Sequence, residues 1–411
     1  MVMGETFGKK LRTARQERFL SRRDLAEPAL GAREITLLEA GRREPGRDVL
    51  RFLAARLAAA PGVPPRAGGE DGAVFLSLAA AQAWDERSYF SCLETAVAAA
   101  AAARAEHDDQ GWWELSLLAG NARLRLGHYP FCIRQASALA RHPLARGRPE
   151  LRSRAQELLA RACQGAGRLP DAVRHGREAV ASAQEGTAGP EVSLAAYQCL
   201  AAALTESGQL AQAWEYCQVF LLPLAGSVPD TLLAGKGFWT AGTVAFRRGD
   251  PTAGVVLHQR AAQLLSPRLD VGLWASFNKA SASMRLASGL RDDQTLACIR
   301  QAEAALAVVG ASRSDALDLL HARGRWQHLG GNHAAAVDLL SEAWDGRSSL
   351  SPQTAAEVAL LLGLSLASLG RRGAAADRFR ESESLFRRAG AADRSSYVRA
   401  LSQRLGSGAE H

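Results

Sequence analysis

The chain has 411 residues, of which 47% are hydrophobic and only 6% aromatic, and its formal net charge is +8. This composition argues against an aromatic-rich sheet core and favours closely packed helices rich in Ala, Leu and Val. The six cysteines form no C-x-x-C pair and have no metal-ligand spacing with the nine histidines, so we expect buried free thiols rather than disulfides or a zinc site. No stretch has the length and apolarity of a signal peptide or membrane span. We therefore expect a cytoplasmic protein without a membrane partner.

The positive charge is concentrated at the start of the chain. Residues 1–66 hold fourteen Lys and Arg against eight Asp and Glu, a net charge of +6, which leaves +2 for the other 345 residues. A concentrated positive charge on a small segment is typical of nucleic-acid binding. The first sixty residues are therefore the candidate DNA-binding region.

Four short helices are predicted in this region. The first covers residues 7–20, and the second begins at Ser21, which has capping-box spacing with Asp24. Pro28 ends the second helix, the third ends at Gly41, and the fourth covers residues 49–57. This order of helices predicts a small independent domain over residues 1–60.

Three stretches of this domain, FGKKLRTARQERFLSRRDLAE, ITLLEAGRREP and VLRFLAARL, resemble the Xre/Cro/lambda-repressor type of helix-turn-helix. The resemblance implies that the third helix enters the major groove. The implied DNA contacts are Arg22 and Arg23 on the supporting helix, Ala32, Arg33, Glu34 and Thr36 at base edges, and Arg42 and Arg43 at phosphates. Between Leu25 and Ile35 the chain is one residue shorter than the family's spacing, and Pro28 falls inside the supporting helix, so we expect a nonstandard turn. The alternative is a helical domain that no longer binds DNA.

A linker is predicted over residues 61–72, which hold three prolines and four glycines and show no apolar periodicity. After it, seven glycines fall 40, 41, 41, 40, 42 and 39 residues apart: Gly127, Gly167, Gly208, Gly249, Gly289, Gly331 and Gly370. Each copy reads as a helix, a turn at the glycine and a second helix. A unit of this size cannot bury its apolar face alone, so the repeats are expected to stack as an all-α solenoid.

Small residues form two columns in these repeats. The residue seven positions before each turn glycine is Gly or Ala, and the residue five positions after it is Ala, Gly or Cys. The copy at Gly289 is the exception, with Gln294 at the second position and the next small residue at Ala297. This difference indicates a short insertion in its turn. This skeleton resembles the tetratricopeptide repeat (TPR), most clearly in GRLPDA and GQLAQA. HEAT-like repeats share the longer period, but the small columns favour TPR-like packing. The resemblance implies a right-handed superhelix of about eight hairpins over residues 73–405, with a weaker first unit around residues 84–89 and a capping helix over 397–405.

In TPR arrays the first helix of each hairpin, helix A, lines the inner groove. Groove-lining residues of TPR proteins stand at fixed offsets before the turn glycine. The same offsets in this chain give the candidate ligand-binding residues Asn121, Arg161, Gln198, Lys236, Trp239, Thr243, Phe246, Lys279 and Arg325. Trp239 and Phe246 would form an apolar pocket, and the polar residues would hold a peptide backbone. Each of these residues taken singly also fits an ordinary solvated position.

No phosphate loop, G-x-S-x-G or H-E-x-x-H motif is present, so neither an enzyme nor a cofactor is predicted. The combined architecture resembles the bacterial peptide-pheromone receptor regulators of quorum sensing. It implies a dimeric transcription regulator that binds a double-stranded DNA operator and responds to a signalling peptide or small molecule. The alternative is a TPR interaction adaptor with a vestigial helix-turn-helix.

Overall fold

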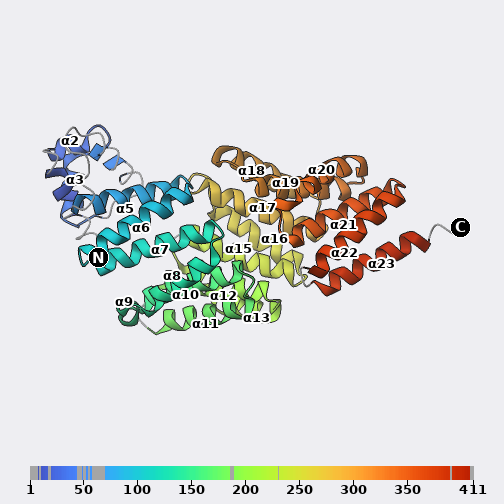
Figure 1. Cartoon of the computed structure of the whole chain (residues 1–411), viewed down its shortest axis with the longest axis horizontal. Coiled ribbons are helices and arrows are strands. Elements are labelled where there is room, and N and C mark those ends of the chain that lie inside the picture. The colour runs from blue at the N-terminus through green and yellow to red at the C-terminus, as the bar shows by residue number, and fades with distance from the viewer. Residues whose placement is uncertain are drawn as a thin grey trace. The chain divides into compact units, whose positions relative to one another are not determined.

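The computed structural model describes residues 8, 11–16, 20–43, 49, 52–53, 56–57, 70–185, 189–229, 231–388 and 391–407. Every regular element within these residues is a helix (Figure 1). This confirms the all-α prediction. The chain divides into two compact units, residues 1–208 and 209–411, and each is described by itself.

The N-terminal region contains α2 (Arg22–Ala26) and α3 (Ala32–Glu39), preceded by a helical segment over residues 11–16. The predicted capping box is confirmed, because the Ser21 hydroxyl accepts the amide of Asp24 at 3.1 Å and the Asp24 carboxylate accepts the amide of Ser21 at 2.8 Å. The prediction that Pro28 ends the second helix is confirmed, and the placement of Pro28 inside that helix is wrong. Helix α2 ends at Ala26, and Glu27 has an extended backbone, the conformation that a following proline favours.

Eight buried apolar residues hold the N-terminal helices together: Leu11, Ala14, Leu25, Ala26, Ile35, Leu38, Leu53 and Leu57. The described residues between 49 and 57 are helical, as predicted, and the remainder of that helix and residues 61–69 of the linker lie outside the described residues. Helix α5 begins at Glu70, inside the segment predicted as linker.

The repeats of the first unit follow one another as antiparallel helices. They are α5 (Glu70–Asp85), α6 (Tyr89–Ala105), α7 (Asp109–Arg125), α8 (Tyr129–Arg141), α9 (Pro143–Gly147), α10 (Pro149–Gly165), α11 (Leu169–Gln184) and α12 (Pro190–Glu206). The weak first repeat is confirmed, since α5 and α6 pack together around Trp84 and Tyr89, whose rings lie 5.4 Å apart. Arg87, with a φ of 60°, stands where later repeats have glycine.

The second unit continues the pattern. Its elements are α13 (Leu210–Tyr216), the π-helix η1 (Cys217–Leu221), α14 (Leu222–Ser227), α15 (Thr231–Arg247), α16 (Pro251–Leu264), α17 (Val271–Ala287), α18 (Asp293–Val309), α19 (Arg313–Leu329), α20 (His333–Asp345), the short 3-10 helix η2 (Arg347–Ser349), α21 (Pro352–Ser368), α22 (Arg372–Arg388) and α23 (Ala392–Ser407). Within this unit α15 pairs with α16, α17 with α18, α19 with α20 and α21 with α22. Helix α23 packs on α22 and is the predicted capping helix, with an earlier start.

The turn glycines and the small columns explain the hairpins. All seven glycines have φ between 73° and 85°, a left-handed conformation that non-glycine residues adopt only with strain. A Cβ on Gly324 would lie 2.5 Å from Leu340 Cγ, and one on Gly363 would lie 2.7 Å from Phe379. The predicted close approach of helix A to its partner is therefore confirmed. The long period arises because most helices A span 17 residues.

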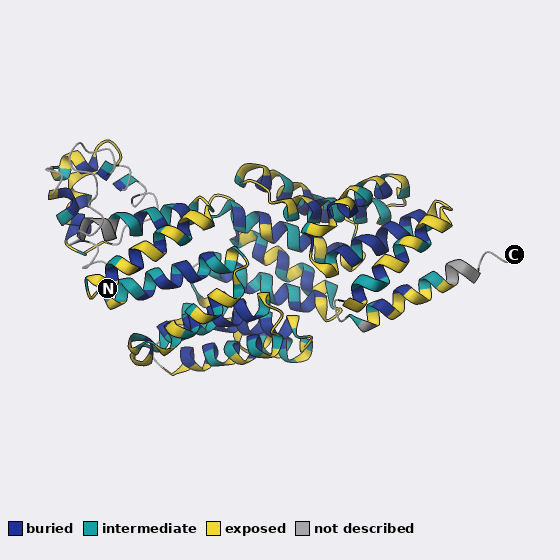
Figure 2. Cartoon of the chain, viewed as in Figure 1, coloured by how far each residue is buried: buried dark blue, intermediate teal, exposed yellow. Residues whose placement is uncertain are grey.

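Burial follows the stacking, with dark stripes along the contact faces of the helices (Figure 2). All six cysteines are free and buried, as predicted, and burial raises the pKa of Cys217 to about 12. Among the described helices, none combines the length and apolarity needed to cross a membrane.

Candidate functional site

Helix α3 presents the residues that the sequence assigns to base contacts. Ala32, Arg33 and Thr36 are exposed, whereas Ile35 and Leu38 on the opposite face are buried in the N-terminal core. The Thr36 hydroxyl donates to the carbonyl of Ala32 at 3.0 Å. The helix therefore has one anchored face and one face open to a partner.

The arginines around this face fall into two groups. Arg22 pairs with Glu39 at 2.8 Å, Arg23 with Glu27 at 2.7 Å, and Arg43 with Glu34 at 3.3 Å. Arg33 and Arg42 are exposed and make no ion pair with any described residue. Among the described residues next to α3, these two guanidinium groups are exposed and carry no ion pair.

A buried ion-pair cluster fixes α3 against its neighbours, and sequence reasoning did not find it. Glu39 is 8% exposed and accepts Nε of Arg15 at 2.6 Å and Nε of Arg22 at 2.8 Å. Burial opposes ionisation of Glu39, but hydrogen bonds and charge from both arginines outweigh it and hold the pKa of its carboxyl below the usual range. Arg15 also donates to the carbonyl of Leu20 at 2.8 Å. One carboxylate thus joins the first helical segment, α2 and α3.

In the first unit, polar residues about one repeat apart contact each other across neighbouring helices A. Both guanidinium nitrogens of Arg154 donate to Glu114, at 2.8 and 2.9 Å. Arg161 donates to Asn121 at 3.2 Å, so the structure brings together two of the predicted ligand-binding residues. Gln198 is half-buried on α12. The predicted columns of α7 and α10 therefore form one continuous polar face.

In the second unit the same columns carry a second polar face. The Lys279 ammonium donates to Asp315 at 2.8 Å and to Asp318 at 2.7 Å, joining α17 to α19. Burial lowers the pKa of Lys279, but the two carboxylates more than offset this effect and raise it. Farther along α19, burial lowers the pKa of the half-buried Arg325. Lys236 and Thr243 are half-buried on α15.

The structure differs from the prediction at the aromatic pair. Trp239 is half-buried and packs edge-on against Phe277, with ring centroids 5.6 Å apart. Phe246 is only 6% exposed, and its ring lies 5.1 Å from that of His258. A Cβ on Gly254 would lie 2.6 Å from the Phe246 ring. Phe246 therefore packs between α15 and α16, because the glycine leaves room for it, and is not open to a ligand.

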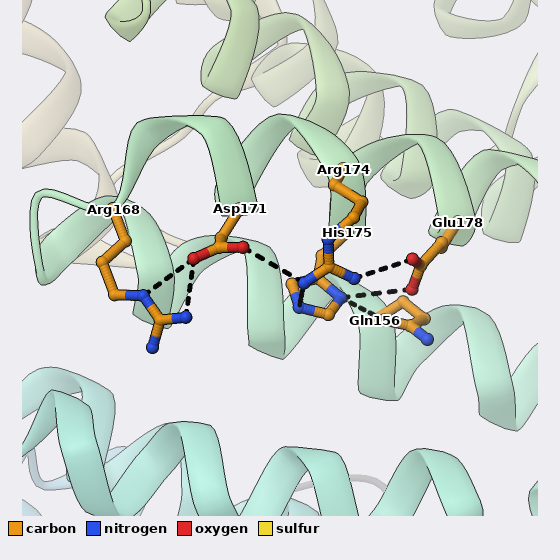
Figure 3. Close-up of polar contacts among 6 residues, drawn as sticks. All are labelled: Gln156, Arg168, Asp171, Arg174, His175 and Glu178. Carbon is orange, nitrogen blue, oxygen red and sulfur yellow. Dashed lines mark hydrogen bonds and ion pairs between the residues drawn. The ribbon is translucent and has the colours of Figure 1, made fainter.

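A polar cluster on α11 joins Arg168, Asp171, Arg174 and Glu178 at helical spacings of three and four residues (Figure 3). His175 lies 2.8 Å from Gln156, and burial lowers the pKa of its imidazole. These contacts are a largely exposed ion-pair network along one helix. Within the described residues, no group of three or more His, Cys, Asp or Glu side chains could hold a metal ion.

No family model and no curated protein matches the chain. Solved structures do match. The Rap conjugation gene regulator of the plasmid pLS20, solved with the Phr* peptide, has a TM-score of 0.56 at 12% identity over 84% of this chain and 95% of that one. Aspartyl phosphate phosphatase F from Bacillus subtilis has a TM-score of 0.55 at 14% identity, over 83% and 94% of the two chains.

A third match is one chain of the crystal structure of the APC/C hetero-tetramer Cut9-Hcn1, with a TM-score of 0.56 at 12% identity over 85% of this chain and 59% of that one. What these proteins share is the fold. The chain is an array of helical hairpins of the TPR type. At these identities the matches do not carry residue roles, so the candidate sites depend on the geometry above.

Proposed function

We propose that the chain is a ligand-responsive, DNA-binding transcription regulator. The observation that carries the proposal is the exposed face of α3, flanked by Arg33 and Arg42, which have no described ion-pair partner although the opposite face is fixed by a buried core. A rigid helix with one open face and uncompensated arginines fits a major groove and its phosphates. Ala32, Glu34 and Thr36 would approach base edges, and Arg22, Arg23 and Arg43 would exchange intramolecular carboxylates for phosphates.

The repeats would supply the ligand site through their helices A. In the second unit, Lys236, Trp239, Thr243, Lys279 and Arg325 combine charges, a hydroxyl and an indole, a mixture that suits a peptide with polar backbone and apolar side chains. In the first unit, the amide and guanidinium groups of Asn121, Arg161 and Gln198 could bind a peptide backbone in the same way. The Rap regulator of similar fold was solved with a peptide, and this motivates a peptide as the first ligand to test.

A homodimer follows from the DNA-binding proposal. A single helix-turn-helix reads one half-site, so two copies related by a two-fold axis gain affinity on a palindromic operator. A ligand that prefers one conformation of the repeats would then shift the population that is competent to bind both half-sites. Light scattering should give about twice 43.7 kDa, and a strictly monomeric mass at tens of micromolar with DNA present would contradict the dimer.

The deciding experiment is an electrophoretic mobility shift with DNA from upstream of the chain's own gene and neighbouring genes. We expect a specific complex whose affinity falls steeply with salt, on the order of one log unit per log unit of salt for each neutralised phosphate. Absence of any complex at low salt would contradict the proposal and favour a TPR interaction adaptor with a vestigial helix-turn-helix.

A further inference from the structure

A cavity of about 270 Å³ opens between α16, α17 and α18 in the second unit. Its lining is unusually polar for a repeat core. Of the few buried polar residues in the described chain, His258, Asn278, Ser281 and Arg285 all line this one cavity. Burying such groups costs free energy unless they are paired, so their concentration calls for a reason.

The residue at the position of His258 can be compared across the copies of the repeat. Nine residues after the turn glycine, the other copies with a regular turn have Ala136, Gly176, Cys217, Leu340 and Phe379, and this copy alone has a histidine. His258 occupies the space that Leu340 and Phe379 fill in their hairpins, because a Cβ on the paired Gly242 would lie 2.3 Å from the His258 ring. An apolar side chain therefore fits this position, and packing does not require histidine.

The next helix is displaced where the cavity opens. Helix α18 begins at Asp293, four residues after Gly289, whereas α16 and α20 begin two residues after Gly249 and Gly331. This confirms the insertion that the sequence predicts around Gln294, a residue that lines the cavity. The irregularity of the repeat and the cavity thus coincide.

The polar groups of the cavity are held in place by one another. His258 Nδ1 lies 3.0 Å from the Ser281 hydroxyl. Arg285 donates from Nε to Thr295 at 2.9 Å and from Nη2 to both oxygens of Asp292, at 3.1 and 2.9 Å. Asn278 Nδ2 donates to the carbonyl of Trp274 at 2.9 Å. Within the described residues, Asn278 Oδ1 and Arg285 Nη1 have no hydrogen bond, which leaves one fixed acceptor and one fixed donor on the same helix.

The cavity carries no uncompensated charge. Burial lowers the pKa of His258 to about 4, so its imidazole is neutral near pH 7. The Arg285 guanidinium is 3% exposed and is neutralised by Asp292. An anion or cation placed here would lose hydration without gaining a counter-charge. The fitting ligand is neutral.

We propose that this cavity binds a small uncharged molecule that carries a carboxamide or lactam group, whose N–H donates to Asn278 Oδ1 and whose carbonyl accepts from Arg285 Nη1. The buried Phe277 ring and Ala262 supply the apolar wall. Side-chain amides at the rim, including Gln294, add donors and acceptors of the same kind. None of the residues that line the cavity is among those proposed above for peptide or DNA, so the proposal can be tested independently of that function.

Nicotinamide and nicotinate form a matched pair of probes, because they differ only in carboxamide against carboxylate. Titration of the full-length protein, followed by ligand-observed NMR, should show nicotinamide binding and about tenfold or more weaker binding of nicotinate, since a carboxylate would enter without a counter-charge. Ala262→Leu, which places a larger side chain in the wall of the cavity, should weaken binding of nicotinamide at least about tenfold. Ala304→Leu, at an exposed position of α18 outside the cavity, should leave it unchanged.

Each other result contradicts the proposal. Failure of the wild type to bind nicotinamide would show that the cavity is not such a site. Equal or stronger binding of nicotinate would overturn the assignment of a neutral ligand. Binding that is as strong in Ala262→Leu as in the wild type, in a variant with unchanged circular dichroism, would place the ligand elsewhere.

Discussion

Both regions pair arginines with carboxylates, but the N-terminal region also presents two exposed arginines beside its candidate DNA-binding helix. Beside α3, Arg33 and Arg42 lie exposed without an ion-pair partner among the described residues. In the repeats, arginines bridge neighbouring helices through carboxylates: Arg154 with Glu114, Arg323 with Glu303, Arg394 with Glu357, and Arg399 with Glu383. The described arginines that bridge helices stabilise both regions, whereas Arg33 and Arg42 remain open to a partner.

The largest effect is expected from removal of the N-terminal region, which tests whether this region alone binds DNA. Deletion of residues 1–66 should reduce affinity for operator DNA by at least about a hundredfold, because phosphate contacts dominate such affinity. The repeats should keep their helical circular dichroism, since α5 begins at Glu70 and each repeat packs mainly on its neighbours. A shortened chain that still binds operator in a mobility shift would contradict the division of roles.

Glu39→Ala should cost about 3 kcal/mol of local stability, because it leaves Arg15 buried without its carboxylate. Hydrogen exchange of the α2 and α3 amides measures this loss, which should also weaken DNA binding. The matched control is Glu303→Ala, which breaks a more exposed Arg–Glu pair in the repeats and should cost about 1 kcal/mol or less. Similar costs for the two variants would remove the distinction between the regions.

Between pH 7 and pH 5, acid should weaken the repeats more than the N-terminal region, which has no histidine before His107. The depressed pKa of the Glu39 carboxyl makes the N-terminal region sensitive only at lower pH. The pKa of His258 is about 4 in the folded state and near 6.5 when unfolded. Below pH 6.5 the unfolded chain therefore binds more protons, and stability falls as the pH falls. Between pH 7 and pH 5 this histidine should remove about 2 kcal/mol. Denaturant unfolding should show a shallower pH dependence in His258→Leu, and an unchanged one would contradict the buried neutral imidazole.

The smallest expected effect concerns single arginines. Arg33→Gln or Arg42→Gln should each weaken DNA binding by about 1 kcal/mol and lower the salt slope by about one if the side chain contacts a phosphate. Arg300→Gln, at an exposed position of α18, is the control and should leave both quantities unchanged. Fluorescence anisotropy over a salt series measures them. An equal loss in the control would mean that only total charge matters.

The sequence predicts the repeats well because their turns depend on local chemistry. Glycine is favoured where φ is near 75°, and small residues are needed where helices approach closely, so both signals appear at fixed spacing. The capping box at Ser21 is local for the same reason. These features could be read one repeat at a time.

Contacts between distant residues could not be read in this way. Arg15 and Glu39 are 24 positions apart, and nothing in either helix alone indicates that they meet. The offset of Phe246 from its glycine places it near the inner face, but the space above Gly254 turns its ring into the hairpin. The cavity needs three helices at once. In the sequence, the sign of this cavity is the interruption at Gln294 of the small-residue column that follows each turn glycine.

The displaced start of α18 suggests how such an array acquires new chemistry. A copy that gains two residues in its turn changes the local packing of one hairpin, while the other copies keep their glycines and small columns. Because stability in a solenoid is close to a sum over neighbouring units, the cost of that change stays within one unit. Duplication followed by divergence of a single copy can therefore add a cavity without rebuilding the rest of the protein.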